Sequence, residues 1–292
     1  MMEAALRDAM LRTGCFATPL DGLRQLGVKE LELYTGPGWE VLALDANDWA
    51  VLDSAEAAQA YRAHLDELGL RVRALHTELD FGEGEPAEHA AWLADAIRLA
   101  DTLGAACVRV GGPMRQDRRM TFADRLRIHA EVFNEAVAAT PDHAAALALE
   151  NAGPHLNNPV LLLNILLETD SDRVGLTVDP GSFYANGAPL SEVYGIVRLL
   201  TPYTRHVHVS NVAYPANARE TARSRGWEYK TYVAPAPGGD LDYRRIADVL
   251  GDGGYRGVLC LEEAYLSRLP VEEHAALLER SAAWLKGITD RP

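Results

Sequence analysis

The sequence predicts an α/β fold, a single (β/α)8 barrel of the TIM type that spans residues 1–292 as one domain. Three observations lead to this prediction. Short apolar runs alternate along the chain with longer amphipathic stretches, which is typical of parallel strand-helix-strand units. Eight such pairs are present, and eight favour a closed barrel over an open sheet. A barrel of this type takes about 250 residues, so the 292 residues need only one.

The elements follow from this alternation and from helix-capping residues. Ser54 or Asp53 precedes an alanine-rich run that Gly69 closes, and Pro86 opens another helix that Gly104 closes. The predicted strands lie near 11–17, 29–35, 71–78, 107–112, 144–151, 174–180, 204–211 and 257–263. The predicted helices lie near 19–27, 54–69, 86–104, 122–140, 158–169, 189–200, 241–250 and 271–286.

Two stretches are longer than a minimal barrel needs. Residues 36–53 follow the second predicted strand, and residues 212–240 follow the seventh. Both come after a strand, so both lie at the carboxyl-end mouth of the barrel, where long loops commonly shape an active site. The second loop concentrates arginine, lysine and aromatic residues. We expect it to line or cover a pocket, with a contact between subunits of a homo-oligomer as the alternative.

Charge and composition exclude some classes of partner. The net charge is −14 and the isoelectric point is near 5.1, so nucleic acids and anionic membranes would be repelled. Cys15, Cys107 and Cys260 form no CxxC pair and lie in apolar runs, which indicates buried thiols. The first twelve residues lack the apolar core of a signal peptide, and no run is long enough to span a bilayer. We therefore expect a cytoplasmic protein.

Four acidic or imidazole side chains stand near the ends of consecutive predicted strands: Glu150, Asp179, His208 and Glu262. The first three are 29 residues apart, about one strand-helix unit each, and the last follows after 54. The carboxyl ends of barrel strands converge on one mouth, so we expect these side chains to meet there. Crowded carboxylates repel one another strongly unless a cation lies between them. The set therefore predicts a site for a divalent cation.

Each of these residues has a plainer interpretation on its own. Glu150 could be a loop charge, Asp179 begins an Asp-Pro-Gly turn, and His208 could be a hydrogen-bonded core histidine. Only their joint position at one end of neighbouring strands favours a metal site. Glu263 follows Glu262 directly, and the sequence alone does not decide which of the two points into the mouth.

The chain resembles the xylose-isomerase-like barrel superfamily of sugar phosphate isomerases and epimerases, which also includes endonuclease IV. The resemblance covers almost the whole chain. It rests on residues 96–104, Leu149-Glu-Asn-Ala-Gly153, Val178-Asp179, His206-Val-His208, the Gly-rich turn 237–242 and residues 254–262. It implies that Glu150, Asp179, His208 and Glu262 hold one Mn²⁺, Mg²⁺ or Co²⁺ ion, with Zn²⁺ as a further possibility.

The resemblance also implies a reaction class. A divalent ion would polarise the carbonyl of a sugar, polyol or keto acid, and Glu150 and Glu262 would act as the acid/base pair next to it. We therefore expect an isomerase or epimerase that works through an enediolate. The alternative is a lyase on the same site, of the inosose-, dehydroshikimate- or keto-glycoside-type. An alternative of another class is a barrel that binds a metabolite or a partner without turnover.

Some positions depart from the superfamily pattern. Ser182 stands where most members have a histidine, and Tyr214 stands where several epimerases have an arginine. Gly111 and Gly112 follow strand four where endonuclease IV supplies a histidine, and no Asp-x-His follows strand seven. These departures, with the acidic charge, argue against DNA repair.

Further polar residues near the predicted mouth are candidates for contact with substrate or for orienting the ligands. Each also has an ordinary structural role available to it, as a core, loop or surface residue. They are Glu32, His76, Arg109, Asn151, His155, Ser182, His206, Arg219 and Lys230, with Arg223 as a further loop candidate.

Overall fold

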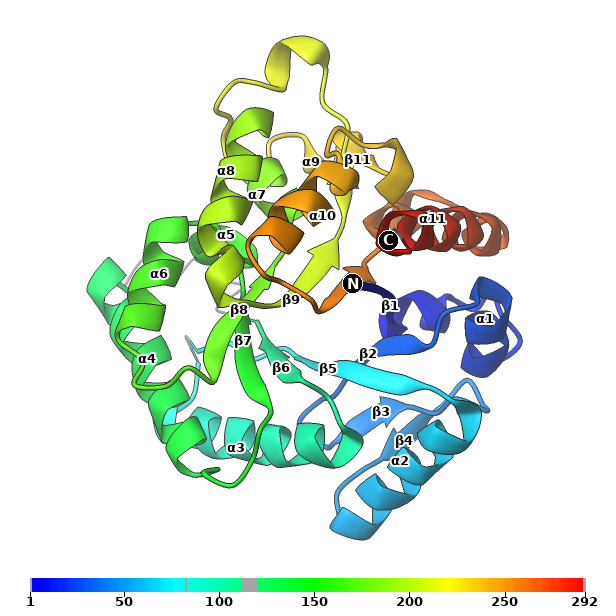
Figure 1. The fold of residues 1–292 in the computed structure, drawn as a ribbon, viewed down its shortest axis with the longest axis vertical. Helices are drawn as coiled ribbons and strands as arrows, with labels where there is room; N and C mark the ends of the chain where they lie inside the picture. Colours follow the sequence, from blue (N-terminus) through cyan, green and yellow to red (C-terminus); the bar gives the residue numbers. More distant parts are fainter. Residues whose placement is uncertain (1, 82, 112–119, 291–292) are drawn as a thin grey trace.

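The computed structural model describes residues 2–81, 83–111 and 120–290, and these form a closed barrel of eight parallel strands (Figure 1). The order around the barrel is β1-β12-β9-β8-β7-β6-β5-β2. The strands are β1 Glu3–Arg7, β2 Glu30–Tyr34, β5 Arg71–Thr77, β6 Cys107–Val110, β7 Ala146–Glu150, β8 Val174–Val178, β9 Thr204–Val209 and β12 Val258–Leu261. The predicted TIM barrel is confirmed.

Helices surround this barrel and cover its outer face (Figure 1). The main ones are α1 Pro19–Leu26, α2 Ala55–Leu68, α3 Pro86–Leu103, α4 Phe122–Ala138, α6 Pro159–Leu167, α8 Leu190–Leu200, α10 Tyr243–Asp252 and α11 His274–Thr289. Ser54 caps α2 by accepting a hydrogen bond from the Ala57 amide, and Gly69 ends that helix at φ 66°. The predicted capping residues are thus confirmed. No helix of the described residues combines the length and the apolar character that crossing a membrane needs.

The prediction of the first strand was wrong. Strand β1 is Glu3–Arg7, whereas the predicted range 11–17 holds the end of a 3-10 helix, Asp8–Thr13, and the residues after it. Gly14 ends that helix with a φ of 78°, in the left-handed region. A strand needs extended backbone, so no strand can run through Gly14. Cys15 in this segment is partly exposed, while Cys107 and Cys260 are buried as expected.

The barrel interior and the shell around it differ in composition. Leucine, valine and isoleucine dominate the large apolar core between strands and helices. Inside the barrel lie two small clusters of buried residues, Ala74, Cys107, Ala146 and Ala148 in one and Ala5, Val258 and Cys260 in the other. Side chains of a strand alternate between its faces, so a residue two positions further along points the same way. Those next positions are Arg7, His76, Arg109, Glu150 and Glu262, all at the mouth.

Both long connections contain structure of their own. Between β2 and α2 lies an antiparallel hairpin of β3 Glu40–Leu42 and β4 Trp49–Val51. Between β9 and α10, in the yellow part of Figure 1, lie β10 Asn211–Val212, the short helix α9 Tyr229–Tyr232 and β11 Val233–Ala234. Strands β10 and β11 pair antiparallel, which ties the start of this segment to its end.

Arg223 holds the second connection against the barrel. Its guanidinium lies 4.7 Å from the ring centre of Tyr184 and 4.3 Å from that of Tyr214. It donates hydrogen bonds to several carbonyls, including those of Tyr184 and Ala188, each at 2.9 Å. Arg223 is therefore a structural residue of residues 212–240, because both of its terminal nitrogens donate to carbonyls of the protein itself.

We expect Arg223→Gln to lower the free energy of unfolding by about 2 kcal/mol or more, because several backbone carbonyls lose their donor. Thermal unfolding and limited proteolysis within 212–240 measure the effect. The matched control is Arg225→Gln, an exposed arginine of the same segment. Equal behaviour of the two variants would contradict the role given to Arg223.

Candidate functional site

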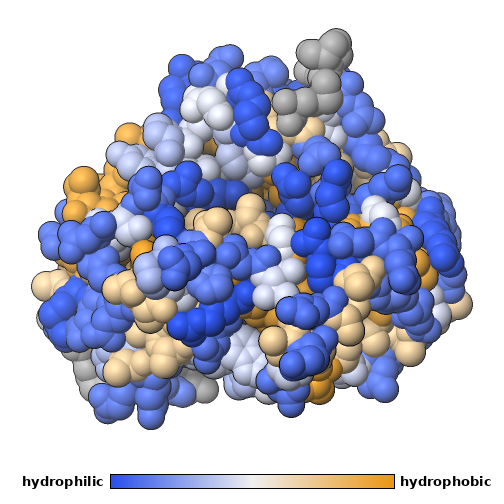
Figure 2. Space-filling view, turned by 60° about the horizontal axis from the view of Figure 1, so that its bottom comes forward, coloured by the Kyte–Doolittle hydropathy of each residue, from blue (hydrophilic) through white to orange (hydrophobic). Residues whose placement is uncertain are grey.

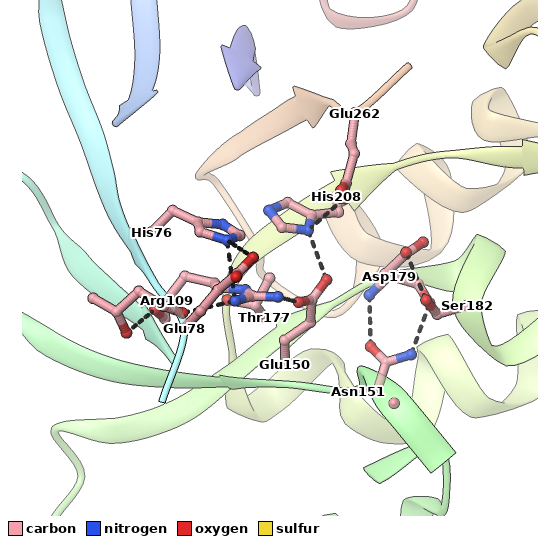
Figure 3. A network of polar contacts seen from close by, with 12 residues as sticks. His76, Glu78, Arg109, Glu150, Asn151, Thr177, Asp179, Ser182, His208 and Glu262 are labelled. Carbon is pink, nitrogen blue, oxygen red and sulfur yellow. Dashed lines mark hydrogen bonds and ion pairs between the residues drawn. The ribbon is translucent and has the colours of Figure 1, made fainter. Parts of the chain in front are cut away.

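Three of the four predicted metal ligands converge at the mouth of the barrel. Nδ1 of His208 lies 2.7 Å from Oε1 of Glu150 and 3.1 Å from Oε2 of Glu262. The possible ligand atoms of these three residues all lie within 4.8 Å of one another. They come from β7, β9 and the end of β12, and Figure 3 shows both carboxylates pointing toward the imidazole of His208. Two carboxylate oxygens and an imidazole nitrogen suit a hard or borderline divalent cation.

Asp179 stands apart from this group, although it lines the same cavity. Its Oδ2 accepts a hydrogen bond from Ser182 at 2.9 Å, and its Oδ1 accepts one from Ser210 at 3.0 Å. Asn151 fixes its backbone, since the Asn151 side chain accepts from the Asp179 amide at 2.7 Å and donates to its carbonyl at 2.8 Å. Asn151 and Ser182 thus hold Asp179, the fourth predicted ligand.

Each of the three converging side chains is also held from behind. The other oxygen of Glu150 accepts a hydrogen bond from Arg109, and the other oxygen of Glu262 accepts one from Arg7. Nε2 of His208 lies 2.8 Å from Oε2 of Glu32. Each of these side chains therefore presents one atom to the common centre while its second polar atom is fixed elsewhere, an arrangement that would suit a metal ion.

Glu32 is completely buried and lies beneath this centre. The pairing of β2 with β5 shifts between Leu31 and Glu32, and such a bulge re-aims the side chains around it. Besides His208, Glu32 contacts Nδ1 of His76 at 3.0 Å and Nε2 of His206 at 2.6 Å. Burial opposes ionisation of Glu32, but its three imidazole partners outweigh burial and hold the pKa of this carboxyl well below its usual value.

The electrostatics favour a positive charge at the common centre. Burial alone would lower the pKa of His208, but the carboxylates of Glu32 and Glu262 outweigh burial and raise it well above its usual value. Burial likewise opposes ionisation of Glu262, yet Arg7 and His208 hold the pKa of that carboxyl below its usual range. A divalent cation at Nδ1 of His208 would replace a proton that this position already attracts.

A second buried group could also hold a cation, formed by Glu32, His206, His208 and Cys260. It uses Nε2 of His208, whereas the group at the mouth uses Nδ1. All four residues are buried below the cavity, and Glu32 already contacts both histidines. We interpret the second group as residues that orient His208 for the group at the mouth.

A cavity of about 490 Å³ opens above Glu150, His208 and Glu262. Its lining includes Glu150, Asp179 and Glu262 together with Arg7, Glu78, Arg109, Ser182, Ser210, Gly226 and Tyr229. Gly226 and Tyr229 come from residues 212–240, so this segment forms part of the cavity wall. Sequence reasoning missed Arg7, Glu78, Ser210 and Tyr229. Of these, Arg7 carried a usable signal, because a strand placed at 3–7 ends on it.

The structure separates the other predicted contact residues. Arg109 and Ser182 line the cavity, while His76, His206 and Glu32 are buried under it. His155 lies 3.4 Å from Arg125 on α4 and is not among the lining residues. Arg219 pairs with Asp240 at 3.0 Å, and Lys230 is exposed on α9. Neither of the last two lines this cavity.

Glu262 and Glu263 point in different directions. Glu262 faces His208, whereas Glu263 is buried on the outer side, where it accepts hydrogen bonds from Ser281 at 2.5 Å and from the Ala236 amide at 3.1 Å. Glu263 thus joins β12 to α11 and to the connection before α10. The structure places Glu262, the first of the two, at the candidate centre.

Comparison with known proteins adds to this geometry. A family model described as "Xylose isomerase-like TIM barrel" matches residues 20–288. No curated protein sequence matches the chain. Solved structures of similar fold include an IOLI protein with a bound zinc atom, at TM-score 0.70 and 15% identity over 98% of both chains.

Two further structures of similar fold are described by their activity. One is D-psicose 3-epimerase from Clostridium cellulolyticum H10 with D-tagatose, at TM-score 0.67 and 15% identity over 99% of this chain and 97% of that one. The other is the probable 3-DHS dehydratase AsbF from Bacillus anthracis, at TM-score 0.65 and 13% identity over 97% and 98%. At these identities the likeness establishes the fold alone.

We expect Glu262→Gln to weaken divalent-metal binding by about tenfold or more, because the amide carries no charge to hold the ion. Glu263→Gln should leave metal affinity unchanged and lower thermal stability, because its buried partners lose a charged acceptor. Calorimetric titration with Mn²⁺ and thermal unfolding of both variants make the comparison. Metal loss in the Glu263 variant alone would assign the ligand to Glu263.

Glu32→Gln tests the support beneath the centre. We expect metal affinity to fall about 10- to 100-fold, because His208 loses the acceptor that orients its ring. Glu30→Gln is the matched control, since Glu30 lies on the same strand but pairs with Arg71 at the far end of the barrel. Similar metal affinity in both variants would mean that Glu32 serves the fold only.

Proposed function

Because the chain belongs to the xylose isomerase-like TIM barrel family, we propose that it is a divalent-metal-dependent isomerase or epimerase of a sugar or keto-polyol. The observation that carries this proposal is the convergence of Oε1 of Glu150, Oε2 of Glu262 and Nδ1 of His208 beneath one cavity. Asp179 is proposed as the fourth ligand, from the cavity wall. Mn²⁺, Mg²⁺, Co²⁺ and Zn²⁺ all accept such a donor set.

The proposed role of each side chain follows from the residues that it contacts. When bound, the metal ion polarises the carbonyl of the substrate and makes the neighbouring C–H more acidic. Glu262 is ionised at neutral pH because Arg7 and His208 lower its pKa, so it can receive the proton from that carbon. Glu150 lines the cavity as well and is proposed as its acid/base partner. Arg7 and Arg109 keep both carboxylates oriented.

The walls of the cavity would position the substrate. Tyr229, from the connection between β9 and α10, lines it close to the carboxylates of Asp179 and Glu262. Burial and these charges raise the pKa of Tyr229 above its usual value, so its hydroxyl stays protonated and can donate a hydrogen bond. The volume of the cavity suits a small-molecule substrate. We further propose that the enzyme is cytoplasmic.

The test is hydrogen-deuterium exchange with solvent. Protein loaded with Mn²⁺ is incubated in D₂O with a panel of ketoses and keto-polyols and followed by NMR. We expect about one ion per chain, deuterium at the carbon next to the carbonyl, and an isomeric product. Glu150→Gln should lose exchange by about a hundredfold or more.

Other results would assign other functions. A product that has lost water would establish a lyase on the same site. Metal binding without exchange on any substrate would indicate a barrel that binds without turnover. Three bound ions per chain would favour an endonuclease-like site, and absence of metal binding would refute the centre altogether.

A further inference from the structure

Two arginines lie side by side at one end of the cavity. Arg7 is the last residue of β1, Arg109 belongs to β6, and both line the cavity. Nη2 of Arg7 lies 2.9 Å from Nε2 of His76, and Nη1 of Arg109 lies 3.2 Å from the same nitrogen. Figure 3 shows His76 and Arg109 on the side of Glu150 away from Asp179. At this end each arginine pairs with a glutamate, Arg7 with Glu262 and Arg109 with Glu150, while Asp179 lies at the other end.

His76 joins the two guanidiniums as a neutral acceptor. Its Nδ1 lies 3.0 Å from Oε1 of Glu32 and donates to that carboxylate, which leaves the lone pair of Nε2 for the arginines. Burial, and then the charge of Arg109, lower the pKa of His76 and favour the neutral ring, although its Nε2 also lies 3.4 Å from Oε1 of Glu78. The imidazole therefore holds two cations together without neutralising either.

The arrangement keeps two positive charges close together in a buried place. Arg109 is only 6% exposed, and it shares Nε2 of His76 with Arg7. Glu150 and Glu262 each offer one oxygen to an arginine and the other toward His208. A divalent ion would share the charge of both carboxylates. The other carboxylate near Arg7 at the rim, Glu78, is 3.8 Å away and 61% exposed.

Among the described residues, the two guanidiniums also retain unused donors. The Nε atoms of both are buried, so the donors that remain for a ligand are on the terminal nitrogens that contact Glu262 and Glu150. Each terminal nitrogen that contacts a glutamate has a second N–H as well. Arginine offers its donors in a planar fork that matches a carboxylate, and it stays charged when buried.

We propose that Arg7 and Arg109 bind a carboxylate group of the substrate, which makes the substrate a polyol acid rather than a neutral sugar. This inference rests on the proposed function, because the hydroxyls or carbonyl of the same molecule would face Glu150, Asp179 and Glu262. The two arginines are the only cationic side chains among the residues that line the cavity in the described structure. A planar carboxylate has two oxygens, one for each guanidinium.

The experiment compares two matched probes, D-gluconate and sorbitol, which share a six-carbon chain and differ only in a carboxylate against a hydroxymethyl group. Each is titrated calorimetrically into the Mn²⁺-loaded protein and into the metal-free protein. We expect gluconate to bind at least about tenfold more tightly than sorbitol in both forms, because two charge-assisted hydrogen bonds are added.

The variants assign the preference to the arginines. Arg109→Gln and Arg7→Gln should each reduce the ratio of gluconate to sorbitol affinity by about tenfold, and Arg109→Lys should keep part of it. Arg127→Gln, an exposed arginine on α4, is the control for removing one positive charge. If either glutamine variant fails to fold, the other and the lysine variant still carry the comparison.

Three results would overturn the proposal. Equal affinity for gluconate and sorbitol would mean that the arginines only orient Glu150 and Glu262. A preference for gluconate that survives in the arginine variants would place its carboxylate on the metal ion. Tighter binding of sorbitol 6-phosphate than of gluconate would assign the pair to a phosphate. The titration of the metal-free protein separates this proposal from the proposed function. It tests carboxylate binding by the arginines even if the protein binds no divalent ion.

Discussion

The buried carboxylate of Glu32 determines the arrangement of the histidines in the barrel. An unpaired charge in a protein interior costs several kcal/mol, and here three imidazole rings surround it. Its two oxygens fix one nitrogen of His76 and one of His208. The remaining nitrogen of His76 then faces Arg7 and Arg109, and that of His208 faces Glu150 and Glu262. One side chain at a strand bulge thereby orders both halves of the site.

The fold was predictable from the sequence because barrel strands repeat at a nearly constant spacing and end at a common mouth. That regularity placed Glu150, His208 and Glu262 together without any knowledge of their contacts. It could not give the direction of Asp179. That depends on hydrogen bonds from Ser182 and Ser210, which come from different elements. The choice between Glu262 and Glu263 likewise depended on the register of β12, which decides the inward face.

One misplaced element concealed an important residue. Residues 11–17 look more strand-like than Glu3–Arg7, because the true strand is short and holds two alanines and two charged residues. Arg7 therefore lay outside the predicted barrel, although its contact with Glu262 holds a candidate ligand in place. In residues 212–240 the abundance of arginine suggested substrate contact. Composition gives the residue types but not their direction, and Arg223 turned out to bind the protein's own carbonyls.

Small residues fill the inside of the barrel below the polar residues of the mouth. Ala5, Ala74, Cys107, Ala148 and Cys260 each stand two positions before a polar residue of the mouth, and their size leaves room for the long side chains above them. Most apolar contact lies outside, between strands and helices. The packing of the shell therefore does not depend on which polar residues the strands carry at the mouth. A barrel built in this way is free to change its substrate without first having to change its architecture.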